Sequence, residues 1–350
     1  MNELIEKLIE LFRKGGIDLL DLIRAISAPL TKKVEEQLNK QVESMASDIQ
    51  KDAIELVIDI IRGEYKAGSK EAIESLIKQG FDEKTLNTTI KTLVHTEAVQ
   101  NILDEAFYSI LEATEFMASD VKDRIKEVVN KANASSLIEG LSRKQAIKDA
   151  VAELAAEQIT GMIYKNGAHM PADKYMANVI QYFQRKAHVD GVLNKLIDNG
   201  HDLVYVNKVG ITCEMCAKYQ GRVYSISGND LRFPKLEKRP PYHGHCVHNL
   251  TAWVEEYKSD DEIKYMQQES NKPFKDNRTE KNIEKYNEIQ RKKSKKNETY
   301  KQWLKFKARM PDDTPDLKVF ASLKARNTKS FQELQQAYRQ VGFGIKKRSE

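Results

Sequence analysis

All three cysteines of this 350-residue chain lie in one short segment that also holds three of its seven histidines. Cys213 and Cys216 form a Cys-x-x-Cys pair in "TCEMCAKYQGRVYSISG", and Cys246 follows in "PPYHGHCVHN" beside His243 and His248. Thiolates and imidazoles in such clusters are the side chains that bind Zn²⁺, usually four in a tetrahedral arrangement. Because an odd number of cysteines cannot complete a disulfide framework, metal binding explains the clustering better than disulfide bonding does.

The spacing of these residues predicts a site with three thiolates and one imidazole. A Cys-x2-Cys pair is followed, after 26 intervening residues, by a His-x2-Cys pair. His248 is the alternative to His243, because residues two apart in an extended segment point to the same side, whereas His245 is adjacent to Cys246 and ranks last. Four protein ligands leave no open position for a substrate, so we expect a structural Zn²⁺. The predicted ligands are Cys213, Cys216, His243 and Cys246.

Three other interpretations of the cysteines stay open. Cysteines are often small buried apolar residues, and the neighbouring histidines would then be polar loop residues. A Cys-x-x-Cys pair also occurs in thioredoxin-like redox sites, but the helix start typical of that motif is missing from the sequence here. Iron also binds thiolate sites, so the residue types alone do not distinguish iron from zinc.

The segments that must position this cluster are mainly helical. Apolar residues recur at helical spacing through the N-terminal half, and "KDAIELVIDIIRGEY" predicts a helix that ends near Gly63. Ser142 is a plausible N-cap of a later helix, and a long helix from "PADKYM" should end at Asn199 and Gly200. His95 stands alone among these helices, which is typical of a structural or surface histidine.

The spacing of apolar residues changes from helical to alternating around the cysteines. "HDLVYVNKV", "GRVYSISG" and "LTAWVEEY" alternate in the manner of strands, and the Cys-x-x-Cys pair should form a turn between the first two. The predicted fold class is therefore mostly α with a small α+β domain. The predicted parts are an N-terminal helical arm (1–30), a helical domain (31–159), a metal-clamped strand-containing domain (160–255) and a basic helical C-terminal tail (256–350).

The positive charge of the chain is concentrated in this C-terminal tail. Residues 255–350 carry 24 Lys and Arg against 16 Asp and Glu, a local charge of +8 in a chain whose total is +5. A cationic segment suits a polyanion, because each phosphate contact releases counterions without reading sequence, although a solvated helix face explains many such runs. The predicted nucleic-acid-binding residues are Arg291, Lys292, Lys293, Lys295, Lys296, Lys301, Lys305, Lys307 and Arg309.

Composition excludes several other classes of protein. A hydrophobic fraction of 40% with 31% charged residues describes an ordinary globular chain rather than a fibrous or disordered one. The start, "MNELIEKLIELFRKGG", lacks the build of a signal peptide, and no apolar run is long enough to span a membrane. We therefore expect synthesis in a reducing cytoplasm and no membrane partner.

From about Ile163 to Trp253 the chain resembles the phage minor capsid protein 2 family, which is related to head morphogenesis proteins of the phage Mu F type. The similar pieces are "YKNGAHM", "KYMANVIQYFQRKA", "NGHDLVYVNKVGITCEMCAKYQGRVYSISG" and "HGHCVH". The positions that match the family pattern are Gly200 to Val206 for a strand, Cys213, Cys216, Gln220, Gly221 and Val223 for a core box, and His243, Cys246 and His248 for a closing box.

Three departures from the family pattern bear on chemistry. Ala168 and Val247 stand where the family usually has arginine, and Met170 stands where an aromatic residue is common. The loss of two arginines argues against a polar catalytic pocket but leaves the metal-site residues intact. The resemblance implies that 160–255 is a Mu F-like minor capsid domain with no catalytic residues.

The resemblance also implies partners and a location. Proteins of this kind are low-copy components of the phage head that associate with the portal protein, with other head proteins and with packaged double-stranded DNA. Some are delivered with the DNA during ejection. We therefore expect a virion protein of the capsid interior, made in the cytoplasm of a bacterial host.

Two other functions are compatible with the same residues. An HNH-like metal-dependent nuclease would use His243 or His245 as a general base beside a structural zinc, but a second Cys-x-x-Cys and a convincing Asp-His pair are missing from the sequence. A cellular zinc-containing nucleic-acid-binding protein would need basic residues around the cluster. Lys235, Lys238 and Arg239 are present there, but neighbouring acidic residues offset them.

Overall fold

The structure is a computed structural model that describes residues 2–26, 31–138, 142–154, 159–310 and 312–349. The chain forms two compact units. The first comprises Met1–Leu8, Ile54–Ser109 and Ala177–Ile289, and the second comprises Ile9–Ala53, Ile110–Met176 and Gln290–Glu350. The boundaries between the units fall within helices, and the division into four parts by sequence stays a prediction.

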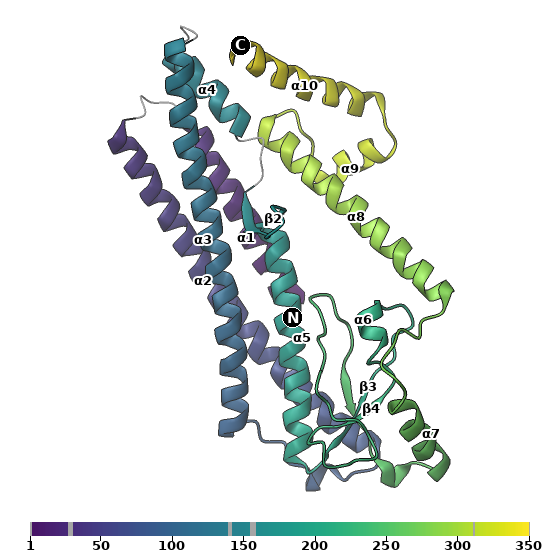
Figure 1. The fold of residues 1–350 in the computed structure, drawn as a ribbon. Coiled ribbons are helices and arrows are strands. Elements are labelled where there is room, and N and C mark those ends of the chain that lie inside the picture. Colours follow the sequence, from purple (N-terminus) through teal and green to yellow (C-terminus); the bar gives the residue numbers. More distant parts are fainter. Residues whose placement is uncertain (1, 27–30, 139–141, 155–158, 311, 350) are drawn as a thin grey trace. The chain divides into compact units, whose positions relative to one another are not determined.

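Helices dominate the described residues, and Figure 1 gives their order along the chain. Gln145 donates its backbone N–H to Ser142 Oγ at 3.3 Å, which confirms the predicted N-cap. The predicted end near Gly63 is wrong, because this residue lies inside a helix of 47 residues. A single glycine costs a helix only about 1 kcal/mol, and the buried stripe around it outweighs that cost. That helix is α2 (Lys32–Lys78). The other helices before the cysteine cluster are α1 (Asn2–Arg24), α3 (Leu93–Ile138), α4 (Arg143–Leu154) and α5 (Ala172–Asp198).

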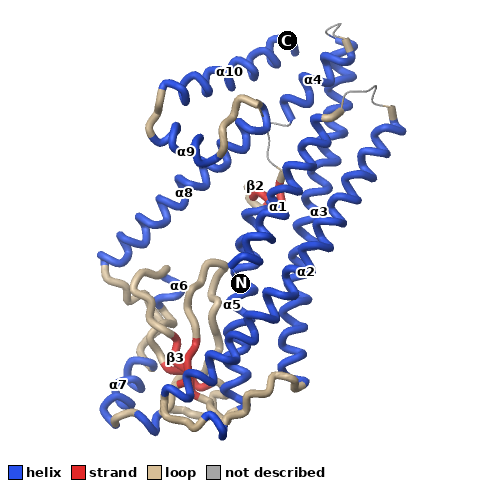
Figure 2. The backbone as a smooth tube through the Cα atoms, turned by 180° about the vertical axis from the view of Figure 1, so that it is seen from behind, coloured by secondary structure: helices blue, strands red, loops and turns tan. Residues whose placement is uncertain are grey.

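Among the described residues, two small antiparallel sheets complete the α+β part, and Figure 2 shows how short their strands are beside the helices. In the second unit, β1 (Thr160–Ile163) pairs with β2 (His169–Pro171). In the first unit, three strands have the order β4-β3-β5, namely β3 (Leu203–Val206), β4 (Val223–Ser225) and β5 (Leu250–Ala252). The three predicted strands are therefore confirmed, as is a mostly α fold with a small α+β part.

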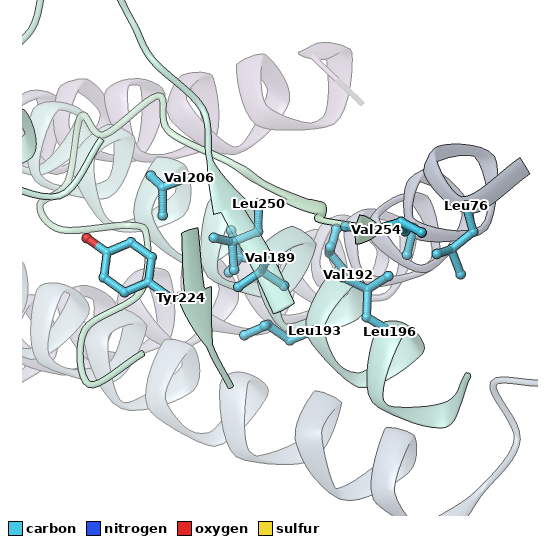
Figure 3. Packing of buried hydrophobic residues seen from close by; sticks show 12 residues of the cluster. Leu76, Val189, Val192, Leu193, Leu196, Val206, Tyr224, Leu250 and Val254 are labelled. Atoms are coloured by element: carbon cyan, nitrogen blue, oxygen red, sulfur yellow. The ribbon is translucent and has the colours of Figure 1, made fainter. Parts of the chain in front are cut away.

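The core of the first unit joins this sheet to the helices (Figure 3). Val204 and Val206 of β3, Leu250 of β5 and Tyr224 of β4 are almost fully buried against α5. From α5 come Val189, Val192, Leu193 and Leu196, and from α2 come Ala72 and Leu76. This packing fixes the ends of β3, β4 and β5, from which the loops with the cysteines and histidines extend.

Helices α2 and α5 approach each other closely at two glycines. A Cβ added at Gly68 would lie 2.0 Å from the backbone oxygen of His188, and one added at Gly191 would lie 2.2 Å from the backbone oxygen of Tyr65. Ser69 reinforces the contact by donating its hydroxyl to the carbonyl of Gly191 at 3.2 Å. Only residues without a side chain allow two helix backbones to pack at this distance.

A bridging histidine lies at the same crossing. His188 of α5 contacts Glu64 Oε2 through Nδ1 at 3.2 Å and Glu71 Oε2 through Nε2 at 2.7 Å. Burial alone would lower the pKa of His188, but the hydrogen bonds and charges of the two carboxylates outweigh it and raise the pKa. Asn249, just before β5, donates to Glu71 Oε1 at 2.8 Å and extends the bridge to the sheet.

A second buried network connects α2, α3 and α5. Asn194 donates to the Tyr65 hydroxyl at 2.8 Å, and that hydroxyl lies 2.7 Å from Nδ1 of His95. His95 Nε2 lies 2.7 Å from Asp198 Oδ2, which also accepts from the fully buried Lys195 at 2.8 Å. His95 is thus a buried structural residue rather than a surface one.

The C-terminal segments are helical, as the sequence predicts. Aromatic residues of three helices, including Phe306, Phe320 and Phe331, make a separate small core in the second unit. Among the described residues, none of the helices is both long and apolar enough to cross a bilayer. The helices here are α7 (Asp260–Ser270), α8 (Glu280–Arg309), α9 (Leu317–Ala325) and α10 (Lys329–Ser349).

Candidate metal centre

The Cys-x-x-Cys pair lies in a single helical turn, α6 (Glu214–Ala217), between β3 and β4. The sequence predicts a plain turn here, and the structure corrects this to one turn of helix with Cys213 as the N-cap. The sulfur of Cys213 accepts the backbone N–H of Cys216 at 3.4 Å. Gly221 then adopts φ +73°, which glycine favours, and leads the chain into β4.

The four predicted ligands and the alternative His248 lie in two overlapping groups that share Cys216. In the first group, Nε2 of His243 lies 3.2 Å from Sγ of Cys213 and 3.2 Å from Sγ of Cys216. In the second, Sγ of Cys216 lies 3.8 Å from Sγ of Cys246, which lies 3.6 Å from Nδ1 of His248. The cluster therefore offers three sulfur and two nitrogen atoms.

The distances in the second group fit a zinc ion. For Zn–S bonds of about 2.3 Å and Zn–N bonds of about 2.05 Å, tetrahedral geometry separates two sulfurs by about 3.8 Å and a sulfur from a nitrogen by about 3.6 Å. The Cys216–Cys246 and Cys246–His248 distances are 3.8 Å and 3.6 Å. Cys213, Cys216 and Cys246 are not in disulfide bonds. The donor set and its spacing thus fit a thiolate-bound cation.

The two inner thiols affect each other strongly. A hydrogen bond from Cys216, helped by backbone amides, outweighs burial and lowers the pKa of Cys246. The same hydrogen bond, together with burial and the negative charge of Cys246, raises the pKa of Cys216. Without a cation only one of the two is readily ionised, whereas a divalent cation would stabilise both as thiolates.

The histidines have distinct neighbours. Nε2 of His248 lies 3.0 Å from Oε1 of Gln220, and that oxygen also accepts the backbone N–H of Val209 at 2.8 Å. Nδ1 of His243 accepts the backbone N–H of His245 at 3.2 Å. The ring of His245 instead lies against Gln181 of α5, with Nδ1 3.0 Å from Oε1. The ranking of His245 below the other two histidines stays a prediction.

The cluster has a closed side and an open side. Cys216, Cys246 and His248 are buried, and the rings of Tyr219 and Tyr242 stack beside them with centroids 4.8 Å apart. The partly exposed Cys213 and His243 border a cavity of about 500 Å³. The other residues that line this cavity are Glu214, Met215, Lys218, Tyr219 and Tyr286.

The similarity of this chain to known proteins covers much more of the sequence than this cluster. The family model described as phage minor capsid protein 2 matches residues 1–318. The chain belongs to the phage minor capsid protein 2 family. The match covers the helical N-terminal half as well as the region from Ile163 to Trp253 that carries the motifs. Neither the curated proteins nor the solved structures contain a match to the chain.

Membership in this family makes the chain a structural component of a phage particle, a minor capsid protein that functions with other head components. The family was identifiable from the cysteine and histidine boxes. The match also includes α1 to α5, for which the sequence alone indicated only helices. The two compact units both contain residues of the matched region.

The predicted nucleic-acid-binding residues lie on α8. Arg291, Lys292, Lys293, Lys295 and Lys296 are exposed, in a stretch in which every residue from 287 to 298 is exposed. Lys305 is also exposed, Lys301 and Lys307 are half-buried, and the side chain of Arg309 is outside the described part of the chain. DNA binding by these residues stays a prediction.

Sequence reasoning missed the polar bridges that hold the centre's scaffold. Glu64 and Glu71 meet His188 across more than 100 residues of sequence, and Tyr65 meets His95 across 30. These residues have no shared motif or spacing that would connect them. Gln220, by contrast, was already part of the matched core box, and the structure adds its contact with His248.

Proposed function

We propose that this minor capsid protein is a low-copy component of the capsid interior at the portal vertex, made in the cytoplasm of the bacterial host. Its partners would be the portal protein, other head proteins and packaged double-stranded DNA. The observation that carries the proposal is the family match over residues 1–318, which includes the helical half together with the cysteine and histidine cluster.

The proposed role of the centre is to bind a structural zinc ion. The strands of the sheet around it have only three or four residues each, so their own pairing is weak. The binding energy of a structural zinc, on the order of 10 kcal/mol, becomes folding energy for the residues it joins. The ion would hold the loop after β3 against the loop before β5.

The proposed DNA contact is made by the cationic part of α8. The residues from 287 to 298 are exposed on every face of the helix, so they have no apolar face to pack on protein. Lysine and arginine side chains in such a segment bind phosphates by charge and without sequence preference. Packaged DNA, which surrounds an internal head protein at high density, is a suitable partner.

The proposed mechanism consists of contacts and includes no catalytic step. A nuclease would need a histidine oriented to take a proton from water. Nδ1 of His243 accepts a backbone N–H rather than facing a carboxylate, and His245 lies against Gln181. A purified sample should therefore leave supercoiled DNA intact with Mg²⁺, Mn²⁺ or Zn²⁺ present.

The decisive experiment is quantitative mass spectrometry of DNA-filled particles and of particles emptied by triggered ejection. A few copies per filled particle support the proposal. Copies lost on emptying indicate delivery with the DNA, and copies retained indicate a portal-bound structural role. Absence from both kinds of particle would overturn the proposed location.

A further inference from the structure

We infer that His248 supplies the imidazole ligand of the metal centre through Nδ1, and that His243 instead donates an N–H···S hydrogen bond to the thiolates. The inference rests on the proposed zinc site and assigns its fourth ligand. It reverses the order that the His-x2-Cys spacing predicts. The assignment follows from two backbone N–H groups, which only donate hydrogen bonds and so fix the tautomers of both rings.

The first of these groups fixes His248. The backbone N–H of Val209 points at a side-chain atom of Gln220 at 2.8 Å, so that atom is the amide oxygen. Nε2 of His248 lies 3.0 Å from the same oxygen and must carry a proton to donate to it. A neutral imidazole has one N–H, so Nδ1 has a free lone pair. This lone pair is on the nitrogen that lies 3.6 Å from Sγ of Cys246.

The arrangement around His248 is the one that metal-binding histidines adopt. Their second ring nitrogen usually donates to a carbonyl or carboxylate, which sets the tautomer and the orientation of the ring. Gln220 provides such an acceptor, and the N–H of Val209 holds its oxygen in place. His248 has no exposed surface, so its orientation is also fixed by packing.

The second backbone group gives His243 the opposite tautomer. The N–H of His245 donates to Nδ1 of His243 at 3.2 Å, so Nδ1 is the acceptor and Nε2 carries the proton. That N–H lies 3.2 Å from the sulfurs of both Cys213 and Cys216. Binding a metal through Nε2 would move the proton to Nδ1, where it would face the N–H of His245.

Distance and exposure support the same division of roles. The 3.2 Å separations of His243 from the two sulfurs are shorter than the roughly 3.6 Å expected between ligands of one zinc ion. His243 borders the open cavity, as Cys213 does, whereas Cys216, Cys246 and His248 are buried. Exposure therefore separates the two histidines from each other. Cys216, Cys246 and His248 form one group of mutually close donor atoms, and Cys213 belongs to the other group. The proposed ligands are Cys216, Cys246 and His248, with Cys213 as the fourth once its sulfur moves toward the ion.

The inference is tested on the full-length protein purified with zinc. Metal content per chain is measured for the wild type and for His243→Gln, His248→Gln and His245→Gln, the last being the matched control. We expect one zinc ion per chain in the wild type, in the control and in His243→Gln, and loss of stoichiometric zinc in His248→Gln. Retention by His248→Gln together with loss by His243→Gln would overturn the assignment while leaving the zinc site itself intact.

A measurement on the wild type keeps the test independent of variant folding. Long-range proton–nitrogen NMR correlations of histidine-labelled protein report which ring nitrogen carries a proton. We expect His248 to be protonated at Nε2 and metal-bound at Nδ1, and His243 to be protonated at Nε2. A metal-bound Nε2 on His243 would refute the assignment. A wild-type protein without zinc would remove both the proposed zinc role and the inference.

Gln220 is a positioning residue for His248 and has its own test. Gln220→Leu removes the acceptor of the Nε2 proton, and the zinc affinity measured by competition with a chromogenic chelator should fall about 10–100-fold. Gln220→Glu keeps an acceptor oxygen and should retain most of the affinity. Equal affinities for the two variants would contradict the role given to this hydrogen bond.

Discussion

Replacement of Gly68 by alanine tests the close contact between α2 and α5. The new methyl group would lie 2.0 Å from the backbone oxygen of His188, with the carbonyl carbon at 2.8 Å. To reach an ordinary contact of about 3.5 Å, the two backbones must separate by about 1.5 Å. Backbone atoms cannot rotate away as the end of a flexible side chain can, so the strain falls on the helix pair.

The expected loss of stability follows from three contributions. Overpacking of this kind costs about 1–3 kcal/mol. Separation of the helices also lengthens the bridge from His188 to Glu71, a hydrogen bond of 2.7 Å; with the exposed carboxylate discounted for solvent screening, we count it as about 1 kcal/mol. Alanine has a higher helix propensity than glycine, which offsets up to about 1 kcal/mol of this loss. The net destabilisation should be about 1–4 kcal/mol.

Thermal unfolding followed by circular dichroism measures this effect, and we expect the midpoint of this 350-residue chain to fall by roughly 1–5 °C. The control is Gly16→Ala, which also lies inside a helix but whose added Cβ meets only Ile159 at 3.8 Å. The control should be neutral or stabilising by up to about 1 kcal/mol. If both variants are equally stable, or if Gly68→Ala is the more stable, the close packing of α2 on α5 is wrong.

Two further predictions concern charge. Because its carboxylate partners raise the pKa of His188, its contribution to stability is complete below the unfolded value of about 6.5 and is lost as pH rises through the higher folded value. As pH rises through that window, the unfolding midpoint of the wild type should therefore fall more steeply than that of His188→Gln. Equal pH dependence of the two midpoints would contradict the bridge. Replacing Lys295 and Lys296 with glutamine should reduce the salt dependence of duplex DNA binding, measured as the slope of log K against log salt, by about 2. The same change at Lys318 and Lys329, which are exposed on other helices, is the control, and an equal effect there would refute a role specific to α8.

Local patterns were sufficient to predict much of the fold. The alternating segments around the cysteines became β3, β4 and β5, and the long helix before them ends at Asp198 with Gly200 at φ +75°. Strand alternation and helix stops depend on neighbouring residues, so a sequence carries them directly. The continuation of α2 through Gly63 depends on packing against distant segments and was not predictable in this way.

The candidate site likewise combines features that local sequence predicts with features that only the folded structure shows. Spacing and residue type identified Cys213, Cys216 and Cys246 as a cluster, because those features are local. The choice between His243 and His248 depends on hydrogen bonds from two backbone N–H groups, which the sequence does not display. The bridges of His188 and His95 join helices that are far apart in the chain, so only the folded arrangement shows them.

The order of the strands affects how the first unit folds. Strand β5 pairs with β3, although β4 and an irregular segment of more than 20 residues separate them in the chain. Closing the loop of 30 residues between Cys216 and Cys246 costs roughly 3 kcal/mol of chain entropy before the strand pairing stabilises it. A cation already held by the Cys-x-x-Cys turn would capture Cys246 and bring β5 to its partner. If the proposed ion binds there, the protein should form the pairing of β3 with β5 faster with zinc present than without it.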